Sequence, residues 1–145
     1  MNEAAKSYWD EYWGGKVKPE FVSVWKFGTD SDNLAQLVVD GVKTATCSAY
    51  IFYELEKQAL PTTKDYNIIL NDDHQSVAIT KTTEVTIIPM NEVSEEFAIA
   101  EGEGTYQNWW SIHEEYFTER LKAVGLEFSE DLLIVCERFE VIHVK

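Results

Sequence analysis

Apolar and polar residues alternate along this chain with two different periods, and each period predicts a different kind of element. Apolar residues at every third or fourth position predict a long helix whose buried stripe consists of Trp109, Ile112, Tyr116, Phe117, Leu121 and Val124. Two-residue alternation predicts a long strand with one face formed by Val77, Ile79, Val85 and Ile87 and the other by Thr80, Thr82, Glu84 and Thr86.

Glycines, prolines and short polar runs mark the ends of these elements. Helices are predicted from Ala5 to Tyr12, from Leu34 to Val38, and at Tyr50–Gln58, Val93–Ala100 and Trp109–Val124. Strands are predicted at Phe21–Phe27, Thr44–Ser48, Tyr66–Leu70, Val77–Ile87 and Leu132–Val144. Because helices and strands mix and no repeat or linker divides the chain, we predict one domain over residues 1–145. Its predicted class is α+β, with a mixed or antiparallel β-barrel flanked by helices.

The charge of the chain limits its partners. Twelve basic residues against 26 acidic residues give a formal net charge of −14 at pH 7, and this charge repels the phosphates of DNA and RNA. An uncharged nucleoside meets no such repulsion, so a small nucleoside-like ligand is the favoured partner. RNA stays a candidate partner through a local basic patch, for which the chain offers Lys16, Lys18, Lys26 and Lys43.

The remaining composition indicates a cytoplasmic protein. No apolar run is long enough to cross a bilayer, and no apolar export segment follows the first residues, so we expect no membrane partner. Cys47 and Cys136 lack metal or redox spacing and fall in predicted strands, which predicts two buried thiols rather than a disulfide. We expect neither a metal site nor a cofactor. The oligomeric state does not follow from the sequence.

Three polar features are unusual for a purely structural domain. The segment Gly41–Thr46 delivers a lysine and two threonines from a helix end directly into a strand. The segment Glu101–Gly104 places two carboxylates on a flexible loop between two helices. Glu137 falls on the apolar face of the last predicted strand, where a carboxylate needs either a partner or a raised pKa.

Each feature also has a structural interpretation. Lys43 can complement the negative end of the preceding helix, and Glu101 and Glu103 can form a solvated turn. A bulge can turn Glu137 outward, because a shift of one residue exchanges the two faces of a strand. The individual features therefore leave both interpretations open.

Aromatic residues offer a surface on which a base can stack. Trp25 and Phe27 alternate with Lys26 and present this surface, although aromatics with such alternation also form ordinary core. His113 follows Trp109 by one helical turn, so it lies near the buried side of the helix, as a pocket donor or as a structural histidine.

Taken together and in this order, five segments resemble the ASCH family of the PUA-like superfamily, in particular its longer bacterial subgroup. They are Trp25–Gly28, Leu37–Ser48, Phe97–Glu103, Trp110–His113 and Cys136–Phe139. The resemblance implies a PUA-like β-barrel surrounded by helices, with a cleft lined by the lysine-threonine element.

The resemblance also implies a function. The family was proposed to bind RNA, and a short bacterial member type is an amidohydrolase that removes the acetyl group from N-acetylcytidine with a lysine, a threonine and a glutamate. The matching residues are Lys43, Thr46 and Glu101, with Glu103 as the alternative glutamate. Ser48 stands where many members carry an arginine, and this difference weakens the case for a phosphate or RNA ligand.

We therefore expect hydrolysis of an N-acylated cytidine, with an RNA-binding domain or a protein-interaction adaptor as alternatives. The adaptor surface would be an exposed patch of the first helix with Trp9 and Trp13. The predicted ligand-binding residues beside the catalytic trio are Trp25, Phe27, Thr44, Glu103, His113 and Glu137.

The expected mechanism has Thr46 as the nucleophile. Lys43 can accept its proton only when neutral, and an acidic protein keeps an ammonium protonated, so electrostatics favour Glu101 as the base and Lys43 as acid and oxyanion donor. Flat strand geometry puts Lys43 and Thr46 on opposite faces. A bend near Gly41, or the long lysine side chain, must then bring them together.

Overall fold

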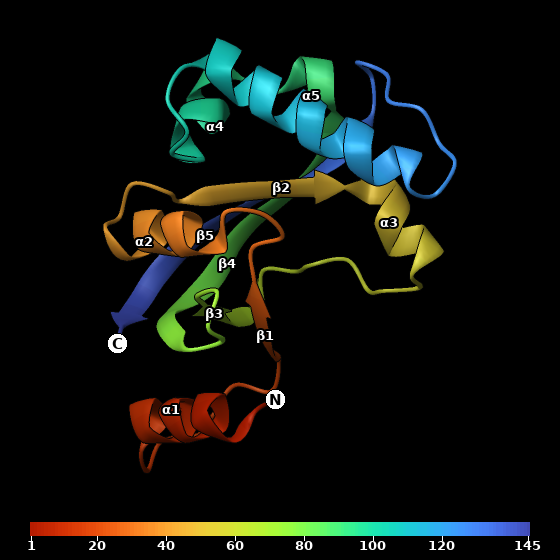
Figure 1. Cartoon of the computed structure of the whole chain (residues 1–145). Helices are drawn as coiled ribbons and strands as arrows, with labels where there is room; N and C mark the ends of the chain where they lie inside the picture. The colour runs from red at the N-terminus through yellow and green to blue at the C-terminus, as the bar shows by residue number, and fades with distance from the viewer.

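A curled sheet of five strands forms the centre of the computed structural model, which describes residues 1–145 (Figure 1). The strands are β1 Val22–Lys26, β2 Ala45–Ala49, β3 Tyr66–Leu70, β4 Ser76–Pro89 and β5 Leu133–Val144. Their order is β1-β3-β4-β5-β2, with β1 parallel to β3 and every other neighbouring pair antiparallel. Strands β1 and β2 are therefore the two edges, and the mixed sheet is an open barrel.

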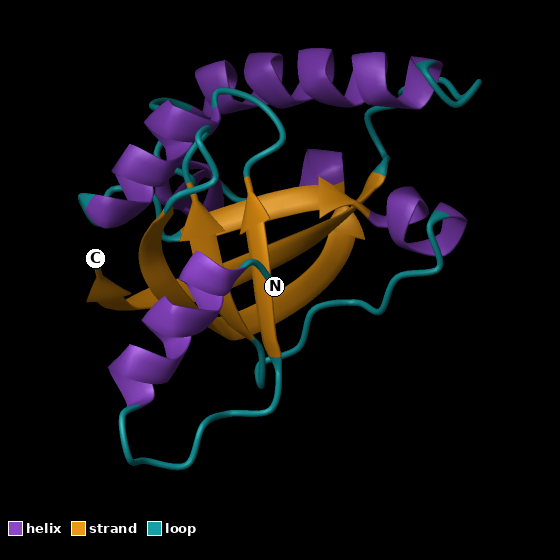
Figure 2. Cartoon of the chain, turned by 60° about the horizontal axis from the view of Figure 1, so that its bottom comes forward, coloured by secondary structure: helices purple, strands orange, loops and turns teal.

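Helices cover the sheet on several sides, which confirms the predicted α+β class (Figure 2). They are α1 Glu3–Trp13, α2 Ser31–Val39, α3 Tyr50–Leu55, α4 Glu95–Ala100 and α5 Tyr106–Lys122, and a 3₁₀ helix spans Met90–Glu92. None of the helices combines the length and the apolar character needed to cross a membrane.

Three groups of buried residues hold these layers together. The largest lies between α4, α5 and strands β2 and β5, with Trp109, Phe117 and Ile134 at its centre. A second group joins α1 to strands β3 and β4. In this group Trp9 is buried and Trp13 packs edge-on against Tyr66. The exposed Trp9–Trp13 patch expected for an adaptor is therefore wrong, because Trp9 is buried and Trp13 is partly buried against the same group.

The curl of the sheet comes from irregular pairing between β4 and β5. The register shifts between Ile79 and Thr80 and again between Thr82 and Glu84. The first shift leaves Ile142 of β5 without a partner, and the second leaves Thr83 of β4 without one, so the two faces of β4 exchange once, at Thr83. Ile87 therefore shares a face with Thr82 instead of with Ile79, and it is 40% exposed. The predicted continuous faces of this strand are therefore wrong beyond the bulges.

Helix α5 buries a narrower stripe than its sequence predicts. The buried residues follow every fourth position, namely Trp109, His113, Phe117 and Leu121. Ile112 and Val124, predicted to be buried, are 37% and 50% exposed. The buried stripe is therefore a single line of residues four positions apart, and it includes His113. This turn of α5 brings His113 toward the loop at Glu101.

Candidate functional site

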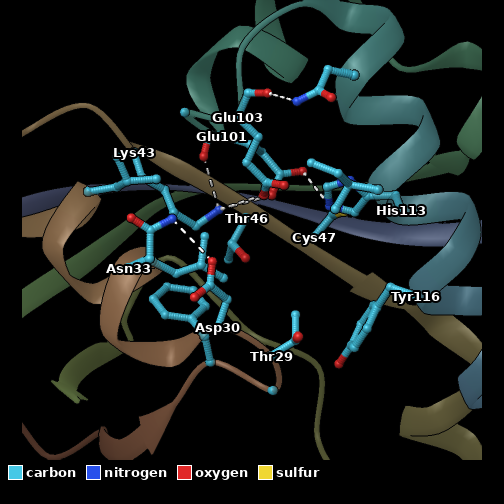
Figure 3. A pocket seen from close by; sticks show the side chains of 17 residues that line it. Thr29, Asp30, Asn33, Lys43, Thr46, Cys47, Glu101, Glu103, His113 and Tyr116 are labelled. Atoms are coloured by element: carbon cyan, nitrogen blue, oxygen red, sulfur yellow. Dashed lines mark hydrogen bonds and ion pairs between the residues drawn. The ribbon is translucent and has the colours of Figure 1, made fainter. Parts of the chain in front are cut away.

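A cavity of about 520 Å³ lies between the start of α2, strand β2, the loop after α4 and helix α5 (Figure 3). Its polar wall consists of Thr29, Asp30, Asn33, Lys43, Thr46, Glu101, Glu103, Asn108 and His113. Its remaining lining is Phe27, Gly28, Leu34, Leu37, Cys47, Gly102, Ile112 and Tyr116. The structure thus brings together the three residues predicted to be catalytic.

The backbone that follows α2 directs Lys43 into this cavity. The N–H groups of Val42 and Lys43 both donate to the carbonyl of Leu37, at 2.9 and 3.0 Å. Gly41 has a φ of +75°, which a glycine adopts without strain. The turn separates Lys43 from β2, so strand alternation does not apply to it. The expected bend near Gly41 is therefore present, and Lys43 and Thr46 line the same cavity.

Lys43 is fully buried against Glu101. Each side chain is 1% exposed, and Lys43 Nζ donates to Glu101 Oε1 at 3.1 Å and to the Glu101 carbonyl at 3.2 Å. Its ammonium also lies 5.4 Å from the centre of the Phe27 ring. A buried charge pair is tolerated only when both partners are hydrogen-bonded, and this condition is met here.

The second oxygen of Glu101 has partners of its own. Trp109 Nε1 donates to Glu101 Oε2 at 2.6 Å, and His113 Nε2 lies 3.5 Å from the same oxygen. Burial acts to raise the pKa of Glu101, but attraction by Lys43 and hydrogen bonds from His113 and Trp109 lower this pKa to about 2. Glu101 is therefore a fixed anion at neutral pH.

His113 is oriented by the helix that carries it. Its Nδ1 lies 2.8 Å from the carbonyl of Trp109, and because a carbonyl only accepts, Nδ1 is the donor. Burial lowers the pKa of His113, but Glu101 outweighs burial and the pKa is raised above its usual value. His113 therefore holds Glu101 in place, which is the structural role considered for it.

Glu103 lines the cavity, and the nearest cation to its carboxylate is Lys43. Glu103 Oε1 lies 4.0 Å from Lys43 Nζ, and the Glu103 side chain is 12% exposed. Burial raises the pKa of Glu103 above its usual value; His113 and Lys43 act to lower it, and Glu101 and Asp30 add to the rise. Asn108 Nδ2 donates to the backbone carbonyl of Glu103 at 2.6 Å and fixes the loop.

The two threonines of the Gly41–Thr46 segment have different surroundings. Thr46 is partly buried on β2, opposite Glu137 on β5, and lines the cavity. Thr44 is exposed, and its backbone N–H donates to the carbonyl of Ala100 at 2.8 Å. Thr44 does not line the cavity. Its hydrogen bond to Ala100 joins the Gly41–Thr46 segment to the end of α4, directly before Glu101.

A second cavity of about 500 Å³ adjoins the first. The two share Phe27, Gly28, Thr46, Cys47 and Tyr116. The second cavity continues along Ser23, Val24, Trp25, Lys26, Ser48, Tyr53, Gln58, Ala59, Pro61, Asp65, Asn67 and Glu137. Of the predicted ligand-binding residues, Glu103 and His113 thus line the first cavity, Trp25 and Glu137 the second, and Phe27 both.

Two residues at the site had no functional role predicted from the sequence. Trp109, predicted in the buried stripe of its helix, is a hydrogen-bond partner of Glu101 behind the cavity wall. Cys47 brings its sulfur within 4.8 Å of ligand atoms of Glu101 and His113, a combination that can hold a metal ion. Burial raises the pKa of the Cys47 thiol well above its usual value. Both carboxylate oxygens of Glu101 already have partners, so we assign no metal to this group.

The four lysines considered for an RNA-binding patch are mostly paired. Lys43 is buried against Glu101, Lys18 contacts Asp10 at 2.7 Å, and Lys26 contacts Asp72 at 3.2 Å.

Cys47 and Cys136 are free thiols that face each other across β2 and β5.

Gly102 should not tolerate a side chain. Its φ is +83°, and an added Cβ would lie 3.3 Å from the backbone of Lys43. Gly102→Ala is expected to lower the free energy of unfolding by about 1–2 kcal/mol and to displace Lys43. Gly104→Ala is the control, because its φ is +91° but its nearest neighbour is the Asn108 side chain at 3.7 Å. Chemical denaturation of both variants measures the difference, and equal losses would contradict the contact with Lys43.

The sequence matches the family model of the ASCH domain over residues 23–143. The chain belongs to the ASCH domain family. The match runs from β1 to the end of β5, so all the cavity residues of this ASCH protein lie within it. Among curated proteins, none matches the sequence significantly.

Solved structures extend the match to the fold. A protein from Enterococcus faecalis has 41% sequence identity and a TM-score of 0.84, covering 97% of this chain and 86% of that chain. An ASCH domain from Lactobacillus crispatus has 28% identity and a TM-score of 0.91, with 97% and 95% covered. A variant ASCH protein from Zymomonas mobilis, with 13% identity, a TM-score of 0.56, and 89% and 76% covered, is similar in fold alone. The predicted PUA-like fold is thereby confirmed.

Proposed function

We propose that this ASCH protein hydrolyses the amide of an N-acylated, cytidine-like nucleoside. The observation that carries the proposal is the buried Lys43–Glu101 pair, which lines one cavity together with Thr46 and Glu103. Amide hydrolysis needs a nucleophile, a base and a donor for the oxyanion. These residue types are present within one cavity of a size that suits a small ligand.

Lys43 has the role of a fixed positive charge. Two of its three N–H bonds are directed to the Glu101 side chain and carbonyl, so the third remains for a substrate oxygen. A donor that is already oriented before the reaction stabilises the oxyanion without a reorganisation cost. This keeps the oxyanion-donor part of the role expected for Lys43, whereas the proton for the leaving amine comes from another group.

The base is better assigned to Glu103 than to Glu101. A carboxylate with a pKa of about 2 and three hydrogen-bonded neighbours is a weak proton acceptor. Glu103 has a raised pKa, lies in the same cavity and accepts no side-chain hydrogen bond. We therefore give Glu101 the role of orienting Lys43, and Glu103, the alternative glutamate of the sequence, that of the base.

The proposed reaction then has two steps. Thr46 Oγ1 forms a bond to the acyl carbon while its proton passes to Glu103, and the C–N bond breaks as the amine nitrogen takes that proton back. Water next attacks the threonine ester and gives a proton to Glu103, the ester C–O bond breaks, and Glu103 returns this proton to Thr46 Oγ1 as the carboxylic acid is released. In both steps the oxyanion lies beside Lys43.

The charge of the molecule supports an uncharged substrate. The formal net charge is −14, and Ser48, at the position where many members of the family carry arginine, bonds Tyr53 at 2.8 Å instead of offering a cation. RNA binding through the lysine patch has less support, because Lys18, Lys26 and Lys43 contact carboxylates. The adaptor alternative lost its expected surface when Trp9 proved to be buried.

Replacing Glu103 tests this assignment. Glu103→Gln keeps the shape of the side chain and removes the base, so kcat for N-acetylcytidine is expected to fall by about 10²–10⁴-fold. The measurement is the rate of cytidine release, followed by chromatography. Glu115→Gln, on the exposed face of α5, is the matched control and should retain the rate of the unmodified protein. Unchanged turnover by a folded Glu103→Gln variant would exclude Glu103 as the base.

A further inference from the structure

Glu137 lies in the second cavity without a hydrogen-bonding or ionic partner. It is directly opposite Thr46 in the antiparallel pair of β2 and β5, so the two side chains are adjacent on one face of the sheet. The second cavity is lined by both residues. A partly buried carboxyl beside the proposed nucleophile, with nothing bonded to it, is available to a ligand.

Another part of the wall of this cavity is aromatic, and hydrogen bonds fix its position. Trp25 Nε1 donates to Asn67 Oδ1 at 2.9 Å, and Asn67 Nδ2 donates to Thr82 Oγ1 at 3.2 Å. The Trp25 ring packs edge-on against Phe27 at 5.0 Å between centroids. A flat ring system with one polar edge therefore finds both an apolar aromatic surface and a carboxyl in the same cavity.

The charges around Glu137 favour its neutral form. Burial raises the pKa of Glu137, and the neighbouring Asp65 adds to this effect, giving a pKa of about 7. The other titratable groups lining the cavity are Tyr53, Tyr116, Cys47 and Lys26. The ammonium of Lys26 is bound to Asp72, so no free cation balances Glu137. A neutral carboxyl presents an O–H donor beside a C=O acceptor.

We propose that the second cavity is the subsite for a heterocyclic base, and that Glu137 reads an edge on which a ring-nitrogen acceptor adjoins an exocyclic N–H donor. Cytosine carries such an edge at N3 and its exocyclic amine. The O–H of Glu137 donates to the ring nitrogen and its C=O accepts from the exocyclic N–H. Acylation leaves this N–H in place, and the acyl group then extends past Thr46 into the first cavity. The assignment rests on the proposed function only for the position of this acyl group.

Equilibrium binding tests the subsite without catalysis. Cytidine is titrated calorimetrically into the unmodified protein, Glu137→Gln and Glu137→Leu. Gln retains a donor and an acceptor, so affinity should stay within about threefold, whereas Leu removes both and should weaken binding by about tenfold. 3-Deazacytidine, which lacks the ring-nitrogen acceptor, should bind the unmodified protein about tenfold more weakly than cytidine. Equal binding of the two nucleosides, or no cytidine binding at all, overturns the proposal without relying on any variant.

The pH dependence gives a signature that a structural role for Glu137 would not produce. Cytidine affinity should fall as the pH rises through about 7, because the ionised carboxylate of Glu137 has no proton to donate. Glu137→Gln should bind with the same affinity at pH 6 and pH 8.5. A pH dependence that persists in this variant counts against the proposal.

The subsite and the proposed reaction can fail separately. If cytidine binds in the expected pattern but N-acetylcytidine is not hydrolysed, the subsite stands and the proposed reaction falls. If N-acetylcytidine is hydrolysed but Glu137→Leu binds cytidine as well as the unmodified protein does, the reaction stands and the subsite falls.

Discussion

Thr46→Val should abolish hydrolysis of N-acetylcytidine, with a loss in kcat of about 10³-fold or more. Valine has the shape of threonine and suits a strand, so β2 and its pairing with β5 are kept. Only the hydroxyl that attacks the acyl carbon is removed. The measurement is single-turnover release of cytidine, together with mass spectrometry for an acylated intermediate on the unmodified protein.

Thr46→Ser is the matched comparison, because it retains the hydroxyl and loses only a methyl group. It should keep more than about a tenth of the rate, since the nucleophile is preserved. A Thr46→Val variant as active as Thr46→Ser would mean that water attacks the amide directly. Glu103 would then activate the water, and Thr46 would only line the cavity.

Lys43→Met should destabilise the protein and stop catalysis. The change leaves Glu101 buried without its cation, and breaking a buried pair costs about 3–5 kcal/mol of unfolding free energy. Urea denaturation measures this loss, and the double variant Lys43→Met with Glu101→Gln should recover much of it. A single variant as stable as the unmodified protein would contradict the buried pair. The double variant should stay inactive, because the oxyanion donor is still missing.

Acid titration tests how the Lys43–Glu101 pair changes the free energy of unfolding with pH. The pKa of Glu101 falls from 4.5 to about 2 on folding, so its stabilising contribution is present above pH 4.5. This contribution is lost as the pH falls from about 4.5 toward 2, where the carboxylate becomes protonated in the folded state too. In Lys43→Met the pKa of Glu101 loses its main lowering influence, so this acid-induced loss should become smaller.

Local pattern predicted most elements because the forces that set them are local. Strand β3 coincides with the predicted Tyr66–Leu70, and α1 ends before Gly14, as expected for a glycine after a helix. The register shifts of β4 and β5 could not be predicted, since they depend on how two strands far apart in the sequence curl together. The burial of Trp9 likewise depends on where α1 packs.

The site was predictable only in part. The resemblance to the family identified Lys43, Thr46 and the two glutamates, but spacing alone could not pair residues separated by 58 positions. It also could not separate the roles of Glu101 and Glu103. That distinction depends on Trp109 and His113, which hold one carboxylate and leave the other free. Only the packing of α5 determines it.

The strand order determines which strands a ligand in the two cavities can connect. Strands β1 and β2 are the two ends of the sheet and do not pair with each other. Phe27, directly after β1, and Thr46, on β2, nevertheless line both cavities. A ligand that contacts both Phe27 and Thr46 therefore bridges the two edge strands of the open barrel. Because no backbone hydrogen bonds join β1 to β2, such a ligand would add contacts between two edge strands that the sheet itself leaves unconnected.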